Sequence, residues 1–103
     1  MSEVRALVRQ FGEGGDDKDV AGEAFYNLGD RASPALQEIV RDPATSLDEL
    51  DSIIFISSMY VKSPELRAAL RTRAGTLPDA EERAMRLELI DALESANGAP
   101  NGS

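Results

Sequence analysis

Apolar residues recur every three or four positions in several short stretches of the chain, and these stretches are separated by small polar residues, glycine and proline. This spacing places the apolar side chains along one face of an α-helix. Serine or aspartate before a stretch and glycine or proline after it are residues that begin and end helices. The pattern therefore predicts an all-α protein. The predicted helices, about six of them, span residues 4–11, 19–28, 35–41, 47–61, 65–74 and 82–96.

Specific signals mark the starts of three of these helices. Ser33 and Ser63 each precede a proline, and serine at the N-cap followed by proline suits the first turn of a helix. Ser46 and Glu49 have the spacing of a capping box. The segment 52–57, SIIFIS, would also suit a buried strand, but the capping box before it and the lack of a second strand-like segment favour a helix.

One phrase occurs three times along the chain, as EVRALVR, ALQEIVR and ELRAALR. Each copy has an apolar second position, a polar third position, two adjacent apolar residues and a closing arginine. The closing arginines Arg9, Arg41 and Arg71 are 32 and 30 residues apart, which is the length of one helical hairpin. A fixed interval of this length is typical of stacked helical repeats, so the sequence predicts three stacked hairpins.

Charge alternates along the chain in step with the repeated phrase. The segments that contain the phrase carry a net positive charge, and the segments between them are strongly acidic, which gives the chain a net charge of −8. If the hairpins stack side by side, the two kinds of helix form two layers of opposite charge.

The run AFYNLGDRASPALQEIVRDP, residues 24–43, resembles one unit of the HEAT-like repeats. It has a first helix that ends in Leu-Gly-Asp, a short turn, and a second helix that Asp-Pro closes. The resemblance implies a right-handed α-solenoid that serves as a binding scaffold, with the second helix of each unit on the concave surface. We expect one helical-repeat domain over residues 1–97 and a disordered tail over 98–103. The glycine-rich segment 12–17, GEGGDD, is expected to be a flexible linker.

Polar residues four positions apart recur on the helices that carry the repeated phrase, opposite their apolar stripes. Stacking would align these side chains into a ladder that binds the carboxylates of an acidic partner surface. A structural role is compatible with this hypothesis, because a cation near the end of a helix also interacts favourably with the helix dipole. The predicted partner-binding residues are Arg5, Arg9, Gln37, Arg41, Arg67 and Arg71.

The acidic segments offer an alternative site. Asp48, Glu49 and Asp51 lie at the start of a predicted helix, where they could cover a basic site on a nuclease or another nucleic-acid-binding protein. The protein would then be an acidic inhibitor or an immunity-type protein. The same carboxylates could equally serve the helix dipole and solubility.

Composition excludes several classes of function. The chain has no cysteine and no histidine, so it lacks a thiolate nucleophile, the usual proton shuttle and the commonest metal ligands. A net charge of −8 argues against nonspecific binding to nucleic acid. The charge-free stretches are too short to cross a bilayer, which favours a cytoplasmic protein.

These observations predict a non-enzymatic protein-binding module, an adaptor or scaffold, that needs no cofactor or metal. Its partner is expected to be another protein, and the chain itself is expected to be a monomer or a weak homo-oligomer. A subunit that only assembles with itself is a further alternative.

Overall fold

A computed structural model describes residues 3–98, with side chains as far as residue 95, and every regular element in this part of the chain is helical. The predicted disordered tail lies outside these residues from position 99 onward. The α-helices are α1 (Glu3–Glu13), α2 (Gly15–Leu28), α3 (Ser33–Arg41), α4 (Leu47–Met59), α5 (Pro64–Gly75) and α6 (Ala80–Gly98), and a 3-10 turn, η1 (Gly29–Ala32), joins α2 to α3.

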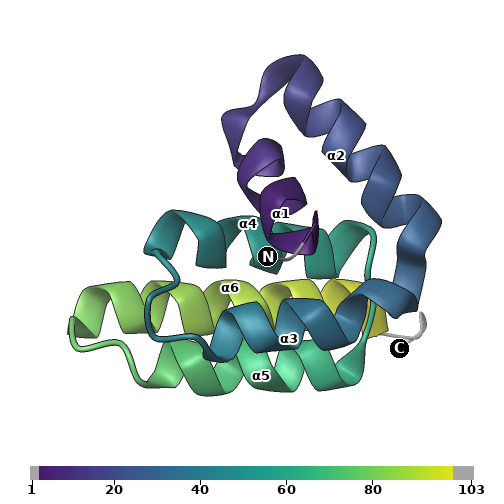
Figure 1. The fold of residues 1–103 in the computed structure, drawn as a ribbon. Helices are drawn as coiled ribbons and strands as arrows, with labels where there is room; N and C mark the ends of the chain where they lie inside the picture. The colour runs from purple at the N-terminus through teal and green to yellow at the C-terminus, as the bar shows by residue number, and fades with distance from the viewer. Residues whose placement is uncertain (1–2, 99–103) are drawn as a thin grey trace.

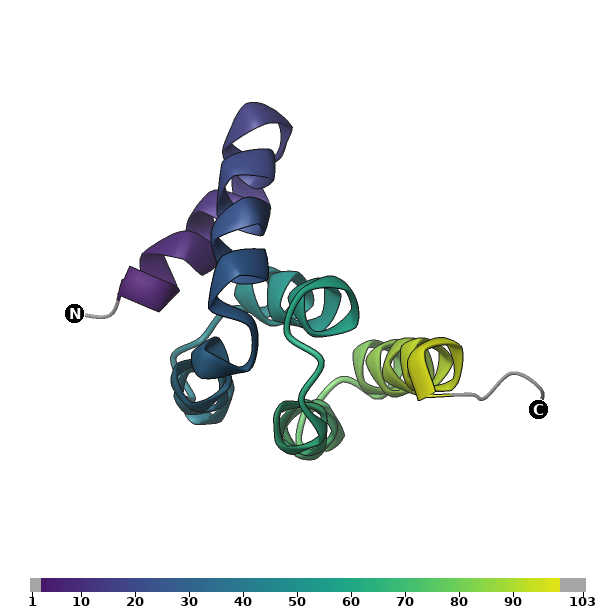
Figure 2. The ribbon, with the colours of Figure 1, turned by 90° about the vertical axis from the view of Figure 1, so that its right-hand side faces the viewer.

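The axes of the last four helices lie roughly along one line of direction, with α4 and α6 running opposite to α3 and α5, and the four helices form two rows (Figures 1 and 2). In one row α3 lies beside α5, and in the other α4 lies beside α6 (Figures 1 and 2). The first two helices run across this arrangement. Helix α1 packs on α4 and touches α3, whereas α2 packs mainly against α1 and the 3-10 turn.

One buried cluster joins all the helices. Apolar residues of the predicted stripes, such as Val8 on α1, Leu36 on α3 and Leu70 on α5, are almost fully buried in it. The other helices contribute residues such as Phe25 and Ile90. The helical spacing of apolar residues therefore identified the core-facing sides of α1, α3 and α5.

The ambiguous segment SIIFIS lies inside α4, so the helical prediction is confirmed there. Ser46 accepts a hydrogen bond from the backbone N–H of Glu49, and the Glu49 carboxylate accepts one from the backbone N–H of Ser46. This capping box starts the helix as predicted. The helix ends at Met59, two residues before the predicted end, and Tyr60 and Val61 lie beyond it.

The glycine-rich linker is shorter than expected. Helix α1 continues to Glu13, and α2 begins at Gly15, so only Gly14 separates the two helices. Gly14 has a φ of 82° and Gly15 a φ of 59°, in the left-handed region that side chains disfavour. Two glycines are therefore enough to reverse the chain here, and α1 and α2 pack against each other.

The two Ser-Pro starts differ from each other. Ser63 is an N-cap whose side chain accepts a hydrogen bond from the backbone N–H of Leu66. Ser33 is not an N-cap, because the 3-10 turn runs directly into α3 and leaves Ser33 with helical backbone angles. Its hydroxyl instead donates a buried hydrogen bond of 2.8 Å to the Ser63 hydroxyl. The serines of the two Ser-Pro pairs thus touch, and α3 and α5 begin at the same level.

Candidate functional site: the groove between α3 and α5

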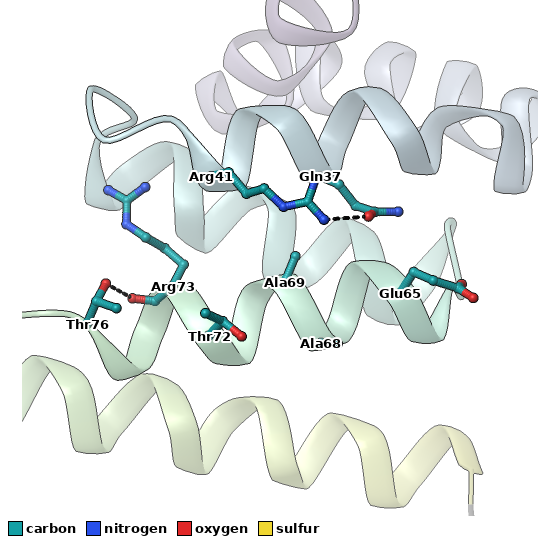
Figure 3. Close-up of a pocket in the computed structure, with 8 residues that line it drawn as sticks. All are labelled: Gln37, Arg41, Glu65, Ala68, Ala69, Thr72, Arg73 and Thr76. Atoms are coloured by element: carbon teal, nitrogen blue, oxygen red, sulfur yellow. Dashed lines mark hydrogen bonds between the residues drawn. The ribbon is translucent and has the colours of Figure 1, made fainter.

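A groove of about 510 Å³ runs along the outer side of the contact between α3 and α5 (Figure 3). Its floor lies on α5, where Ala68, Ala69 and Thr72 have side chains too small to fill the space beside α3. Because all three residues lie on the same face of one helix, the gap is continuous. The lining residues are Gln37, Arg41, Glu65, Ala68, Ala69, Thr72, Arg73 and Thr76.

Two of the predicted partner-binding residues, Gln37 and Arg41, form the α3 side of this groove (Figure 3). One guanidinium nitrogen of Arg41 donates to the Gln37 side-chain oxygen at 3.0 Å. The Gln37 amide nitrogen in turn donates to the Ser33 hydroxyl at 3.0 Å. This chain of hydrogen bonds fixes the orientation of both side chains, and Arg41 remains exposed.

Arg73 is a functional candidate that the sequence analysis missed. Its guanidinium group donates to the backbone oxygens of Val40, Asp42 and Thr45, at distances of 2.8, 2.7 and 3.0 Å. These oxygens belong to the end of α3 and the loop that follows, where carbonyls have no partner within the helix. Arg73 lies two residues beyond the repeated phrase, so the comparison of the three phrases did not include it.

The arginines of the groove differ from the other arginines in their partners. Arg41 is bonded to an amide and Arg73 to carbonyls, and among the described residues neither has a carboxylate partner. Two positive charges are therefore not neutralised at the end of the groove where α3 and α5 finish.

A second hollow of about 300 Å³ continues the groove toward the start of the two helices. It shares Gln37 and Glu65 with the larger hollow and adds Asp30, Pro34 and Pro64. Together the two hollows follow the α3/α5 contact over its whole length.

Arg5 and Arg9 do not lie at the groove. Arg5 pairs with Asp42 at 3.0 Å and with Glu49 at 3.7 Å, and its side chain is only 19% exposed. The Nε of Arg9 donates to the Glu49 carboxylate at 3.0 Å. Both arginines thus attach α1 to α4 and to the loop before it.

Arg67 and Arg71 also lie outside the groove. Arg71 pairs with Asp91 and Glu94 of α6. The hydrogen bond to Glu94 has the larger effect in raising the pKa of its guanidinium group, and the hydrogen bond to Asp91 adds to it. Arg67 is half-buried and has no hydrogen-bond or ion-pair partner among the described side chains. The predicted residues are therefore divided among several helix contacts and do not form a single ladder.

The alternative acidic site is partly occupied by internal contacts. Asp48 is exposed, whereas the Glu49 side chain is only 12% exposed and pairs with Arg5 and Arg9. Asp51 accepts two hydrogen bonds, at 2.8 and 3.0 Å, from the buried guanidinium group of Arg86.

The carboxylate of Glu49 has a lowered pKa. The hydrogen bond from the Ser46 backbone N–H favours its charged form most, and the guanidinium groups of Arg9 and Arg5 add to this. Together these interactions outweigh burial, which disfavours the charge. Glu49 is thus charged at neutral pH and holds α1 against the start of α4 through its ion pairs with Arg5 and Arg9.

The described residues contain no cluster of three or more side chains suited to hold a metal ion. No helix within residues 3–98 has the length and apolar character needed to cross a membrane. No protein family, curated protein or solved structure matches this chain. The α3/α5 groove is therefore the candidate site on the strength of its own geometry and charge.

Proposed function

We propose that this protein is a non-enzymatic protein-binding module that holds a segment of its partner in the groove between α3 and α5. The observation that carries the proposal is the pair Arg41 and Arg73, whose charges have no carboxylate partner among the described residues although the chain is strongly acidic. A guanidinium group can bind a carboxylate through two parallel hydrogen bonds. An acidic side chain of the partner would supply the missing counter-charge.

The shape of the groove supports a segment of protein as the ligand. The groove is long, open to solvent and floored by Ala68, Ala69 and Thr72, so a backbone can approach α5 closely. It lacks the enclosed cavity that a small-molecule or catalytic site usually provides.

We further propose that the helices form a HEAT-like right-handed stack. The two rows, α3 beside α5 and α4 beside α6, support this architecture for the second half of the chain. The resemblance to HEAT-like repeats places the second helix of each unit on the binding surface, and α3 and α5 are the helices in that position. The groove lies between these two helices.

The acidic inhibitor is a second candidate. Exposed Asp48 and the net charge of −8 favour it. Glu49 and Asp51 support it less than their sequence position suggests, because arginines of the same chain already neutralise them. A basic partner would have to displace those arginines.

Capture of partners from a lysate of the source cells tests both candidates. Thr72→Trp would fill the groove from an exposed position, and Arg41→Glu would reverse one of its charges. Arg67→Glu makes the same charge change outside the groove and is the matched control. We expect one specific partner to be retained by the wild type and by the control and lost by both groove variants.

All variants must first show the circular dichroism of the wild type. If Thr72→Trp retains the partner, the groove is not the binding site. If Asp48→Lys loses the partner and the groove variants retain it, the acidic inhibitor is the correct candidate.

A further inference from the structure

The two ends of the α3/α5 groove carry opposite charges. Asp30 and Glu65 lie where the helices begin, and Arg41 and Arg73 lie where they end. This separation exists because the helices are parallel and in register. The hydroxyl of Ser33, the first residue of α3, is bonded at 2.8 Å to that of Ser63, the N-cap of α5, and Arg73 near the end of α5 is bonded to the last turn of α3.

The charges at both ends lack an oppositely charged partner among the described residues, and all of them are exposed except that of Arg73, which is half-buried. Glu65 and Asp30 are exposed, and among the described residues neither carboxylate has a cationic partner. The Glu65 carboxylate accepts one hydrogen bond, from the Ser63 hydroxyl at 3.1 Å. At the opposite end, Arg41 and Arg73 are likewise bonded only to uncharged groups.

The middle of the groove has no charged side chain on its α5 side. Between Glu65 and Thr76 the α5 side presents Ala68, Ala69 and Thr72. A rise of 1.5 Å per residue makes this stretch of helix about 16 Å long. A partner segment would cover that length with about eleven helical residues or about five extended ones.

We propose that the groove accepts its partner segment in one direction only, with an acidic residue at Arg41 and Arg73, a basic residue at Asp30 and Glu65, and small or apolar residues between them. The inference rests on the proposed function and adds the chemistry and the orientation of the ligand. In the opposite direction each end of the segment would meet a like charge.

Selection of random peptides displayed on phage tests this proposal directly. The bait is the full chain, and the counter-selection uses Thr72→Trp to remove peptides that bind elsewhere. We expect the enriched peptides to share one acidic and one basic position, in a fixed order and at a fixed separation.

Fluorescence polarisation then measures the best peptide and a version with its two charges exchanged. We expect the exchanged peptide to bind the wild type about tenfold more weakly or worse. The double variant Arg41→Glu with Glu65→Lys keeps the net charge but should reduce that difference to less than about threefold. Arg67→Glu with Glu38→Lys makes the same charge changes at residues that do not line the groove and should keep the difference.

The outcomes separate this inference from the proposed function. Groove-dependent peptides without a charge order would overturn the inference and leave the proposed function standing. If no enriched peptide depends on position 72, both are overturned. If analytical ultracentrifugation shows a wild-type dimer that Thr72→Trp dissociates, the occupant is a second copy of this chain and the inference is overturned.

Discussion

Arg73 connects two helices that are far apart in the sequence. Its guanidinium group satisfies three backbone oxygens around the end of α3, and hydrogen bonds from a charged donor are stronger than those from a neutral one. If Arg73 were replaced, the Asp42 oxygen would keep its hydrogen bond from the Thr45 backbone N–H, but the oxygens of Val40 and Thr45 would lose the Arg73 donor. Arg73 therefore has a structural role in addition to its charge at the groove.

Replacement of this arginine should be costly. We expect Arg73→Gln to lower the free energy of unfolding by about 2–3 kcal/mol, because at most one of the three hydrogen bonds can be kept. Urea denaturation followed by circular dichroism measures the change. Arg67 lies on the same helix, and its side chain has no hydrogen bond or ion pair among the described residues, so Arg67→Gln should change the free energy of unfolding by less than about 0.5 kcal/mol. Equal effects of the two substitutions would contradict this role for Arg73.

Glu49 makes stability depend on pH. Its pKa is lowered in the folded protein, so its contribution is fully present above the ordinary pKa of a glutamate and is lost as the pH falls through the lowered value. We expect Glu49→Gln to be destabilising at neutral pH and to differ less from the wild type in acid. Urea denaturation at a series of pH values tests this expectation. A difference that stays constant down to acid pH would show that the charge of Glu49 is not responsible.

At this scale the sequence identified some of the residues that line the groove. Gln37 and Arg41 were predicted from the repeated phrase and line the groove, whereas Glu65 and Arg73 were not predicted. Their roles depend on α3 and α5 starting at the same level, which sequence periodicity does not specify. Arg5 was predicted to face solvent because its helical position is polar, but α4 and the loop before it lie against that side of α1.

At the scale of the helices, the bond between Ser33 and Ser63 sets the register of α3 and α5. The two hydroxyls are buried, and the Ser63 oxygen also caps α5. The repeated Ser-Pro therefore has two uses: one serine caps its helix, and the other aligns it with the neighbouring helix.

A double-mutant cycle can separate these two uses. We expect Ser63→Ala to cost about 1–2 kcal/mol, because both the cap and the hydrogen bond to Ser33 are lost. Ser33→Ala should cost about 1 kcal/mol. The cost of the double variant should be smaller than the sum of the two single costs, by about 0.5 kcal/mol or more. Thermal and urea unfolding provide the values. Strict additivity would show that the two serines do not interact in solution.

Helix positions were largely predictable, and the exceptions have physical causes. The apolar spacing and the capping box placed α4 correctly, although its residues also suit a strand. The predicted N-cap of α3 was wrong because a 3-10 turn, and not an extended N-cap residue, leads into this helix. The predicted linker was longer than the observed one because Gly14 and Gly15 alone provide the left-handed backbone angles that reverse the chain.

At the scale of the whole molecule, the alternating charge of the sequence serves mainly in ion pairs between neighbouring helices. Arginines of α1 and α5 pair with carboxylates of α4 and α6, and Arg86 of α6 pairs with Asp51 of α4. Such pairs lie between neighbouring helices and orient them. The outer surface is therefore less polarised into a basic and an acidic face than the sequence alone suggests.

Helix α2 should be less protected from hydrogen exchange than α4, which buries Leu50, Ile53, Ile54, Ile56 and Ser57. Helix α2 packs mainly against α1 and the 3-10 turn, and it buries only Ala21, Gly22 and Phe25. We expect the free energy of the opening reactions that expose the amides of α2 to be about 1–2 kcal/mol lower than that for α4. Hydrogen exchange followed by NMR measures both helices in one sample. Equal protection of α2 and α4 would show that the two helices open together.

The register of α3 and α5 also bears on the order of folding. Ser33 and Ser63 close a loop of 30 residues that contains the whole of α4, and closing a chain of that length costs about 3 kcal/mol of entropy in addition to a constant term. Local hairpins close shorter loops and are entropically cheaper to form. We therefore expect α4 to pack on α5 before the two serines meet, so that the groove forms after the contact between α4 and α5.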